Sequence, residues 1–115
     1  VCDLSEERCN YVKSLYPNTQ VTNDFNKILN SKDIDAVIIS TPANTHFQLA
    51  KQALQNGKHI LVEKPLAMHV AEVDELESIA LEKKLVKPML TSLICSMKKI
   101  SKLIVQKHAS LSSRR

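Results

Sequence analysis

The sequence predicts an α/β fold with a parallel sheet, and three observations support this. Two short apolar runs, residues 34–39 and 60–62, have the near-continuous hydrophobic character of strands that are buried on both faces. Each run is followed by a segment with the apolar spacing of a helix. Strict alternation of strands and helices is typical of βαβ units. At 115 residues, the chain forms one domain at most.

Capping residues and apolar spacing locate the first two helices. Ser5 is a favourable N-cap for the first, in which Cys9, Val12 and Leu15 form an apolar stripe. Asp24 is a favourable cap for a short helix that ends near residue 29. Residues 1–3 resemble the end of a strand, and a weak strand is expected near residue 21.

Two longer helices are expected after the apolar runs. The first spans about residues 44–56, with Pro42 at its start and Gly57 at its left-handed C′ position. Its core-facing stripe comprises Phe47, Ala50 and Leu54. The second spans about residues 68–84, and its expected inward-facing residues are Val70, Val73, Leu76, Ile79 and Ala80.

The charge distribution divides the chain at its last third. Residues 1–82 carry seven basic and twelve acidic residues, a net charge of −5, whereas residues 83–115 carry nine basic and no acidic residues. We therefore predict a domain at residues 1–86 and a divergent basic tail at residues 87–115, with a helix at 89–107. The abrupt change leads to the hypothesis that this tail is a frame-shifted reading. A non-catalytic binding module with a basic tail is the alternative function.

The composition of the chain indicates the cellular compartment in which the protein is expected. No apolar run is long enough for a transmembrane helix, and the N-terminus lacks a signal peptide, so a cytoplasmic protein without membrane contact is expected. Cys2, Cys9 and Cys95 lack metal-ligand spacing, so reduced thiols and no metal are expected. The tail lacks aromatic residues, so base-specific recognition of single-stranded nucleic acid is not expected, and nucleic acid is not the expected partner.

Polar residues follow the predicted strands, where ligands of open α/β sheets bind. Asp3 is suited to accept the hydroxyls of an adenosine ribose, although a surface acid is the plainer interpretation. The Thr41-Pro42 turn is suited to face a phosphate, a ribose or a nicotinamide. The plainer interpretation is a strand-to-helix turn with Asn44 as the N-cap. His46 is more often structural in such a place.

The Glu63-Lys64-Pro65 tripeptide is the most distinctive of these features. Two opposite charges at the end of a buried strand are costly unless they are paired or functional. Lys64 is suited to proton transfer if burial lowers its pKa. Pro65 fixes the backbone, with a cis bond as one option. A surface ion pair remains the alternative.

Two stretches, residues 35–46 and 53–67, resemble the N-terminal domain of the Gfo/Idh/MocA family of oxidoreductases, and the similarity extends over residues 1–86. The resemblance implies a Rossmann-type domain for NAD or NADP. The sequence has a single glycine and begins at Val1, so a partial sheet is expected, without the first strand and the glycine-rich loop. We therefore expect a fragment that is inactive alone.

The resemblance also implies roles for individual residues. Asp3 corresponds to the acid that holds the adenosine ribose, which favours NAD over NADP. The cofactor-binding turn and the segment after it correspond to Ser40, Thr41, Pro42, Asn44 and His46. Glu63 corresponds to a residue near the nicotinamide ribose. Lys64 corresponds to the catalytic lysine that orients substrate and assists proton transfer.

The family transfers hydride to or from a carbon of a sugar, cyclitol or similar alcohol. The resemblance therefore implies an NAD(P)-dependent oxidoreductase with a small-molecule substrate of that type as its partner. A homo-oligomer is compatible with the full-length protein.

Overall fold

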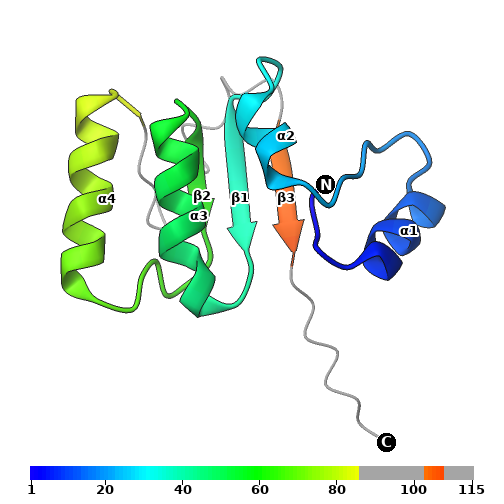
Figure 1. Ribbon diagram of the computed structural model, residues 1–115, viewed down its shortest axis with the longest axis horizontal. Coiled ribbons are helices and arrows are strands. Elements are labelled where there is room, and N and C mark those ends of the chain that lie inside the picture. Colours follow the sequence, from blue (N-terminus) through cyan, green and yellow to red (C-terminus); the bar gives the residue numbers. More distant parts are fainter. Residues whose placement is uncertain (86–102, 108–115) are drawn as a thin grey trace, which may run out of the picture.

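A computed structural model describes residues 1–85 and 103–107 of the chain (Figure 1). Its helices and strands follow in the order α1 (Glu6–Leu15), α2 (Phe25–Asn30), β1 (Ala36–Ser40), α3 (Ala43–Gln55), β2 (His59–Val62), α4 (Val70–Glu82) and β3 (Leu103–Lys107).

The three strands form a parallel sheet in the order β2-β1-β3. In this sheet Val37 is in register with Ile60, and Ile39 with Val62. The predicted α/β class with a parallel sheet is confirmed. Because the strands are parallel, their carboxyl ends meet at one edge of the sheet.

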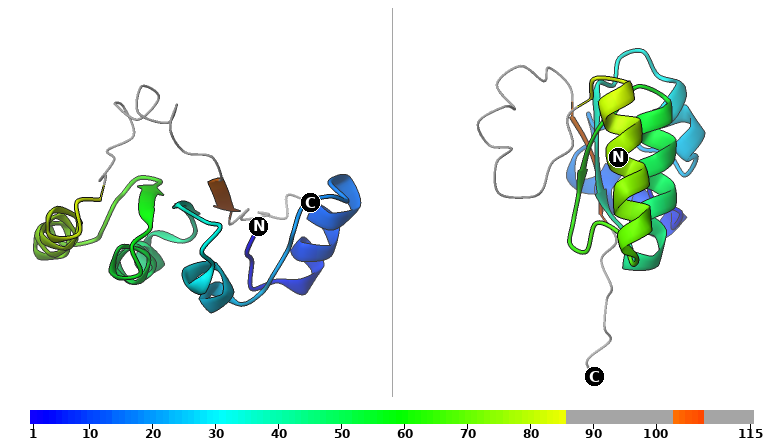
Figure 2. Two further views of the ribbon diagram at one scale, coloured as in Figure 1. Left: turned by 90° about the horizontal axis from the view of Figure 1, so that it is seen from above. Right: turned by 90° about the vertical axis from the view of Figure 1, so that its left-hand side faces the viewer.

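The helices α2, α3 and α4 lie on one face of the sheet in the described part of the chain (Figures 1 and 2). Helix α3 contacts β1, β2 and α4, and an ion pair of 2.6 Å between Lys51 and Glu75 joins the two helices. The core between these elements contains fully buried Ile39, Leu54 and Leu76. Apolar burial of this kind is the main stabilising contribution to a small domain.

The N-terminal segment lies beyond β3, on the side away from β1 (Figures 1 and 2). The strands expected near residues 3 and 21 are reduced to a single parallel bridge between Cys2 and Thr22. Backbone bonds from Asp3 N to Thr22 O (3.1 Å) and from Thr22 N to Val1 O (2.9 Å) accompany it.

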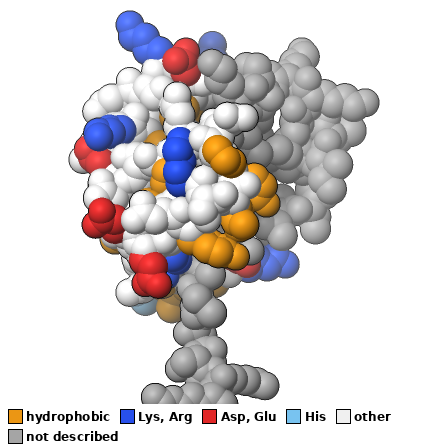
Figure 3. Space-filling view, turned by 90° about the vertical axis from the view of Figure 1, so that its right-hand side faces the viewer, with side chains coloured by type: hydrophobic (Ala, Val, Ile, Leu, Met, Phe, Trp, Pro, Cys, Tyr) orange, Lys and Arg blue, Asp and Glu red, His pale blue; other side chains and the backbone are white. Residues whose placement is uncertain are grey.

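Helix α1 lies at one end of the molecule and has no buried residue. The predicted stripe on this helix is therefore only partly correct, because Leu15 is 52% exposed while Cys9 and Val12 are half-buried. Tyr11 and Tyr16 are also exposed. Figure 3 views the molecule from this end and shows hydrophobic side chains gathered among charged ones.

The predicted helix ends are largely confirmed. Ser5 and Asp24 are N-caps whose side chains accept hydrogen bonds from Arg8 N and Asn26 N. These bonds satisfy backbone N–H groups that have no partner within the first turn of the helix. Gly57 has φ +73°, which glycine adopts without the steric cost of a Cβ. One inward-facing residue was predicted wrongly, because Val70 is the first residue of α4 and is 78% exposed.

The tail differs from its predicted form where it is described. Residues 103–107 form strand β3 rather than the end of a helix. The β-branched pair Ile104-Val105 favours an extended chain, and pairing with β1 provides backbone partners for that extended segment. The rest of the predicted helix, and Cys95, lie outside the described residues. The division of the chain at residue 86 stays a prediction.

Candidate functional site

Polar residues from two strands meet at the carboxyl edge of the sheet, as expected. Ser40 ends β1, and its hydroxyl donates a hydrogen bond of 2.6 Å to Oε2 of Glu63, which directly follows β2. The backbone N–H of Glu63 donates to the carbonyl of Ile39 at 3.0 Å. The parallel ladder therefore continues to the site, and it holds the Glu63 backbone beside Ser40.

His46 connects the two turns that follow these strands. Its ring is 1% exposed, with Nδ1 2.6 Å from the carbonyl oxygen of Pro65 and Nε2 2.7 Å from that of Thr41. Both partners are acceptors. A neutral imidazole has one N–H and donates one of these bonds at a time, whereas a doubly protonated ring donates both. His46 thus holds the two turns together, while its implied part in cofactor binding stays a prediction.

The Thr41-Pro42 turn is held by the first turn of α3. Pro42 is the residue before that helix, and its carbonyl accepts from the backbone N–H of Thr45 at 2.9 Å. The hydroxyl of Thr45 lies 2.6 Å from that of Thr41 and 2.7 Å from the Pro42 carbonyl. This turn is thereby pre-ordered before any ligand binds.

Lys64 and Asn44 face the exterior. Both residues are exposed, and Lys64 is joined to Pro65 by a cis peptide bond, which was one of the sequence-based options. Lys64 follows Glu63 directly and therefore lies at the same edge as Ser40. The burial on which the proton-transfer argument for Lys64 depended is therefore not observed in the described residues.

Asp3 is placed on the other side of β3, where its carboxylate is buried at 5% exposure. Oδ2 accepts from Arg8 Nε at 2.9 Å, while Oδ1 accepts from the Arg8 terminal nitrogen at 3.0 Å and from Ser5 N at 2.8 Å. The hydrogen bond to Asp3 raises the pKa of Arg8 above its already high value. Sequence reasoning missed Arg8, although its five-residue spacing from Asp3 was visible.

Lys58 is a second residue that the sequence analysis did not single out. It is 7% exposed, and its Nζ donates to the carbonyls of Ser31 and Ile34 at 2.5 and 2.7 Å. These bonds connect the loop before β1 to the start of β2. Lys58 supports the sheet from the edge opposite the candidate site.

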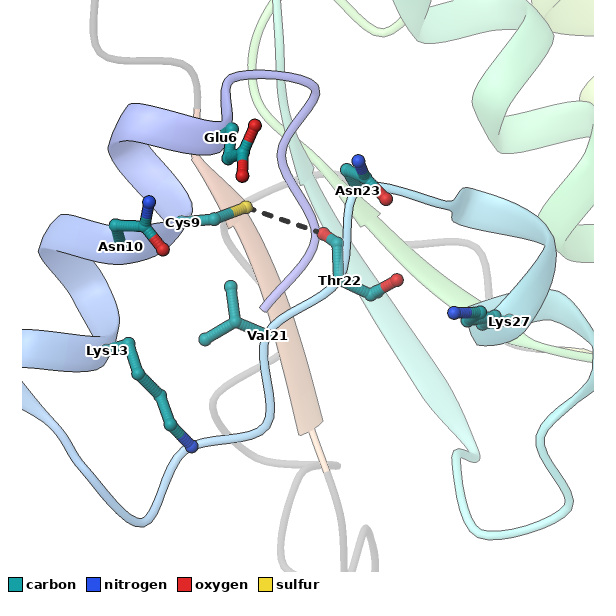
Figure 4. A pocket seen from close by; sticks show the side chains of 8 residues that line it. All are labelled: Glu6, Cys9, Asn10, Lys13, Val21, Thr22, Asn23 and Lys27. Carbon is teal, nitrogen blue, oxygen red and sulfur yellow. Dashed lines mark hydrogen bonds between the residues drawn. The ribbon is translucent and has the colours of Figure 1, made fainter.

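Two adjoining hollows lie elsewhere, beside the bridge of Cys2 and Thr22. The first, of about 400 Å³, is lined by residues that include Cys9, Lys13, Thr22 and Lys27. Figure 4 shows the Cys9 thiol pointing to the Thr22 carbonyl, 3.7 Å away. Burial raises the pKa of the Cys2 thiol close by. Neither hollow includes the residues at the strand ends, so they are separate from the candidate site.

The part of the chain that the structure describes has no helix with the length and apolar character needed to cross a membrane. In the same part, no three His, Cys, Asp or Glu side chains gather as a metal site would require.

A parallel sheet with polar turns at its carboxyl edge is the architecture of a nucleotide-binding α/β domain. The chain belongs to the Gfo/Idh/MocA family, because residues 1–91 match the family described as an oxidoreductase family with an NAD-binding Rossmann fold. The resemblance drawn from the two motifs is thus confirmed.

Curated relatives agree with this assignment. The chain is 39% identical to the uncharacterized oxidoreductase YdgJ of Escherichia coli K12 over 69 residues, which are 60% of this chain and 20% of YdgJ. It is 30% identical to the scyllo-inositol 2-dehydrogenase (NADP(+)) IolW of Bacillus subtilis over 83 residues, or 72% of this chain and 23% of IolW. The chain therefore spans about a fifth of the length of these relatives.

Solved structures support the same family assignment. The 3-ketoreductase KijD10 of Actinomadura kijaniata, in complex with NADP and TDP-benzene, superposes with a TM-score of 0.68 at 27% identity over 74% of this chain and 26% of its own. The scyllo-inositol dehydrogenase of Lactobacillus casei gives a TM-score of 0.64 at 25% identity over 72% of this chain and 25% of its own.

Proposed function

We propose that this chain supplies the dinucleotide-binding part of an NAD(P)-dependent oxidoreductase that acts on a sugar, cyclitol or similar alcohol. The observation that carries the proposal is the junction of Ser40 and Glu63 at the carboxyl edge, with Lys64 next to it. A nicotinamide ring placed at this edge would have an exposed lysine beside it. Family membership and relatives such as the inositol dehydrogenases support the substrate class.

The residues at the edge have distinct roles in this proposal. Glu63 and Ser40 hold each other and present oxygen atoms to the nicotinamide ribose, while the Thr41-Pro42 turn and Asn44 line the cofactor. Lys64 orients the substrate hydroxyl. It takes up or returns the proton of that hydroxyl, depending on the direction in which hydride is transferred. The bound dinucleotide supplies the hydride chemistry. His46 keeps the two turns that line the cofactor in place.

The cofactor preference in the proposal is NAD, with NADP as the alternative. Asp3 is the group that favours NAD, since its carboxylate accepts ribose hydroxyls and repels a 2′-phosphate. Arg8 complicates the preference for NAD. Its guanidinium group already donates to both carboxylate oxygens of Asp3, and a guanidinium group also suits a phosphate. A ribose must therefore displace or share Arg8.

Asp3→Asn tests this preference in the full chain. We expect the chain to bind NADH more tightly than NADPH. The variant should lose about tenfold in affinity for NADH, because one charge-assisted bond is removed. Its affinity for NADPH should not fall, because the carboxylate that repels the 2′-phosphate is removed as well. Titration calorimetry at high nucleotide concentration measures the affinities for NADH and NADPH.

Asp74→Asn, at an exposed position on α4, is the matched control and should leave both affinities unchanged. Tighter binding of NADPH by the unaltered chain would contradict the preference for NAD while leaving the dinucleotide site intact. Equal losses in Asp74→Asn would show that the effect is not specific to Asp3.

A further inference from the structure

The central strand of the sheet is completed by the last described segment of the chain. Strand β1 is flanked by β2 on one side and by β3 on the other, both parallel to it. The pairing with β3 runs from Ala36 with Leu103 to Ser40 with Lys107. Strand β3 thus spans the whole length of β1.

The position of β3 can be compared with the strand order of a doubly wound sheet. The half-sheet order 3-2-1-4-5 places the first strand between the second and the fourth. Here the segment ending at Asp3 corresponds to the second strand and β1 to the fourth, and β3 lies between them (Figures 1 and 2). Strand β3 therefore lies at the position that the first strand has in that order.

Strand β1 needs a partner on this side. Its residues Ala36, Val37 and Ile39 are buried, and an open edge on such a strand would present unpaired backbone groups to non-native pairing. The sequence Leu-Ile-Val-Gln-Lys of β3 contains two β-branched residues, which favour strands.

We propose that residues 103–107 act as a complementing strand within the chain, which fills a strand-acceptor slot between β1 and the N-terminal segment. The occupant is this chain's own segment, and its orientation is parallel. Strand β3 ends in register with Ser40, so the slot also closes the sheet beside the candidate site. Residues 103–107 of the basic tail are then part of the fold.

The alternation of backbone groups along β1 provides a sharp test. Asp35 and Ile39 accept backbone bonds from His59 and Glu63, on the β2 side. In a parallel ladder, alternate residues face opposite neighbours. Ile38 and Ser40 therefore direct their N–H groups toward β3, whereas Val37 and Ile39 direct theirs toward β2.

Gln106→Pro removes a backbone donor from β3 at a polar residue. We expect amide hydrogen exchange at Ile38 and Ser40 to accelerate about tenfold, with little change at Val37 and Ile39. Ser112→Pro places the same residue type beyond β3 and is the control. Equal acceleration at all four amides, or none at Ile38 and Ser40, would overturn the proposal.

A cross-link gives a second measurement that does not depend on the stability of the proline variant. Cysteines are introduced at Ile38 and Val105, whose Cα atoms are in register. Neighbouring strands lie about 4.8 Å apart, within the reach of a disulfide. We expect a link within one chain, found by peptide mapping.

The paired substitution Ile38→Cys with Leu61→Cys, also in register, is the positive control. A link between two chains would make the slot an interface between copies and would overturn the assignment to the chain's own strand. A Leu61 link without any Val105 link would overturn it as well.

Discussion

His46→Ala is expected to lower the free energy of unfolding by about 3–4 kcal/mol. The ring is 1% exposed, so its removal leaves a cavity between α3 and the two turns. It also leaves the carbonyls of Thr41 and Pro65 without the partner that they share. Urea unfolding followed by circular dichroism measures the change.

Gln48→Ala is the control for this prediction, since Gln48 is exposed on the same helix and should change stability by less than about 0.5 kcal/mol. The loss in His46→Ala should be accompanied by faster amide exchange in the segment at residues 63–66. A cost close to that of the control would show that the ring does not hold the turns.

Leu54→Ala is expected to destabilise the fold by about 3 kcal/mol. Leu54 is fully buried on α3, which contacts both β1 and β2, and the truncated side chain leaves a cavity in the core. The transfer free energy of the lost methine and methyl groups adds to the cost of this cavity. The unfolding midpoint should fall with an unchanged dependence on denaturant.

Leu81→Ala makes the same chemical change at a position that is 73% exposed, and it should be nearly neutral. If the two leucine variants lost similar stability, the core would not lie between α3 and the sheet. If Leu54→Ala changed the denaturant dependence, the variant would have altered more than packing.

Much of the fold follows from local patterns. The near-continuous apolar runs around Val37 and Ile60 predicted parallel strands, because such runs are typical of strands in parallel sheets. The caps at Ser5 and Asp24 and the C′ glycine at Gly57 were also correct, since each depends on interactions within one turn.

The features that sequence analysis missed depend on distant partners. The spacing in residues 103–107 suited a helix, yet pairing with β1 makes this segment a strand. Lys58 is buried because carbonyls 24 and 27 residues away accept its bonds. The stripe on α1 failed at Leu15 because the helix lies at the end of the molecule, away from the core.

The candidate site was predictable in its location but not in its internal contacts. Parallel strands bring their carboxyl ends together, so the meeting of Ser40 with Glu63 follows from the fold. The bonds of His46 to two separate turns, and of Arg8 to Asp3, depend on side-chain geometry. These contacts required the structure.

The most direct test of the account is to map where a dinucleotide binds. Amide chemical shifts of the full chain are followed during a titration with NADH at millimolar concentration. The account predicts that the largest changes fall at the carboxyl edge, at Ser40, Thr41, Glu63 and Lys64, with further changes at Asp3. Changes centred on the hollow beside Cys9 and Thr22, or no changes at all, would contradict it.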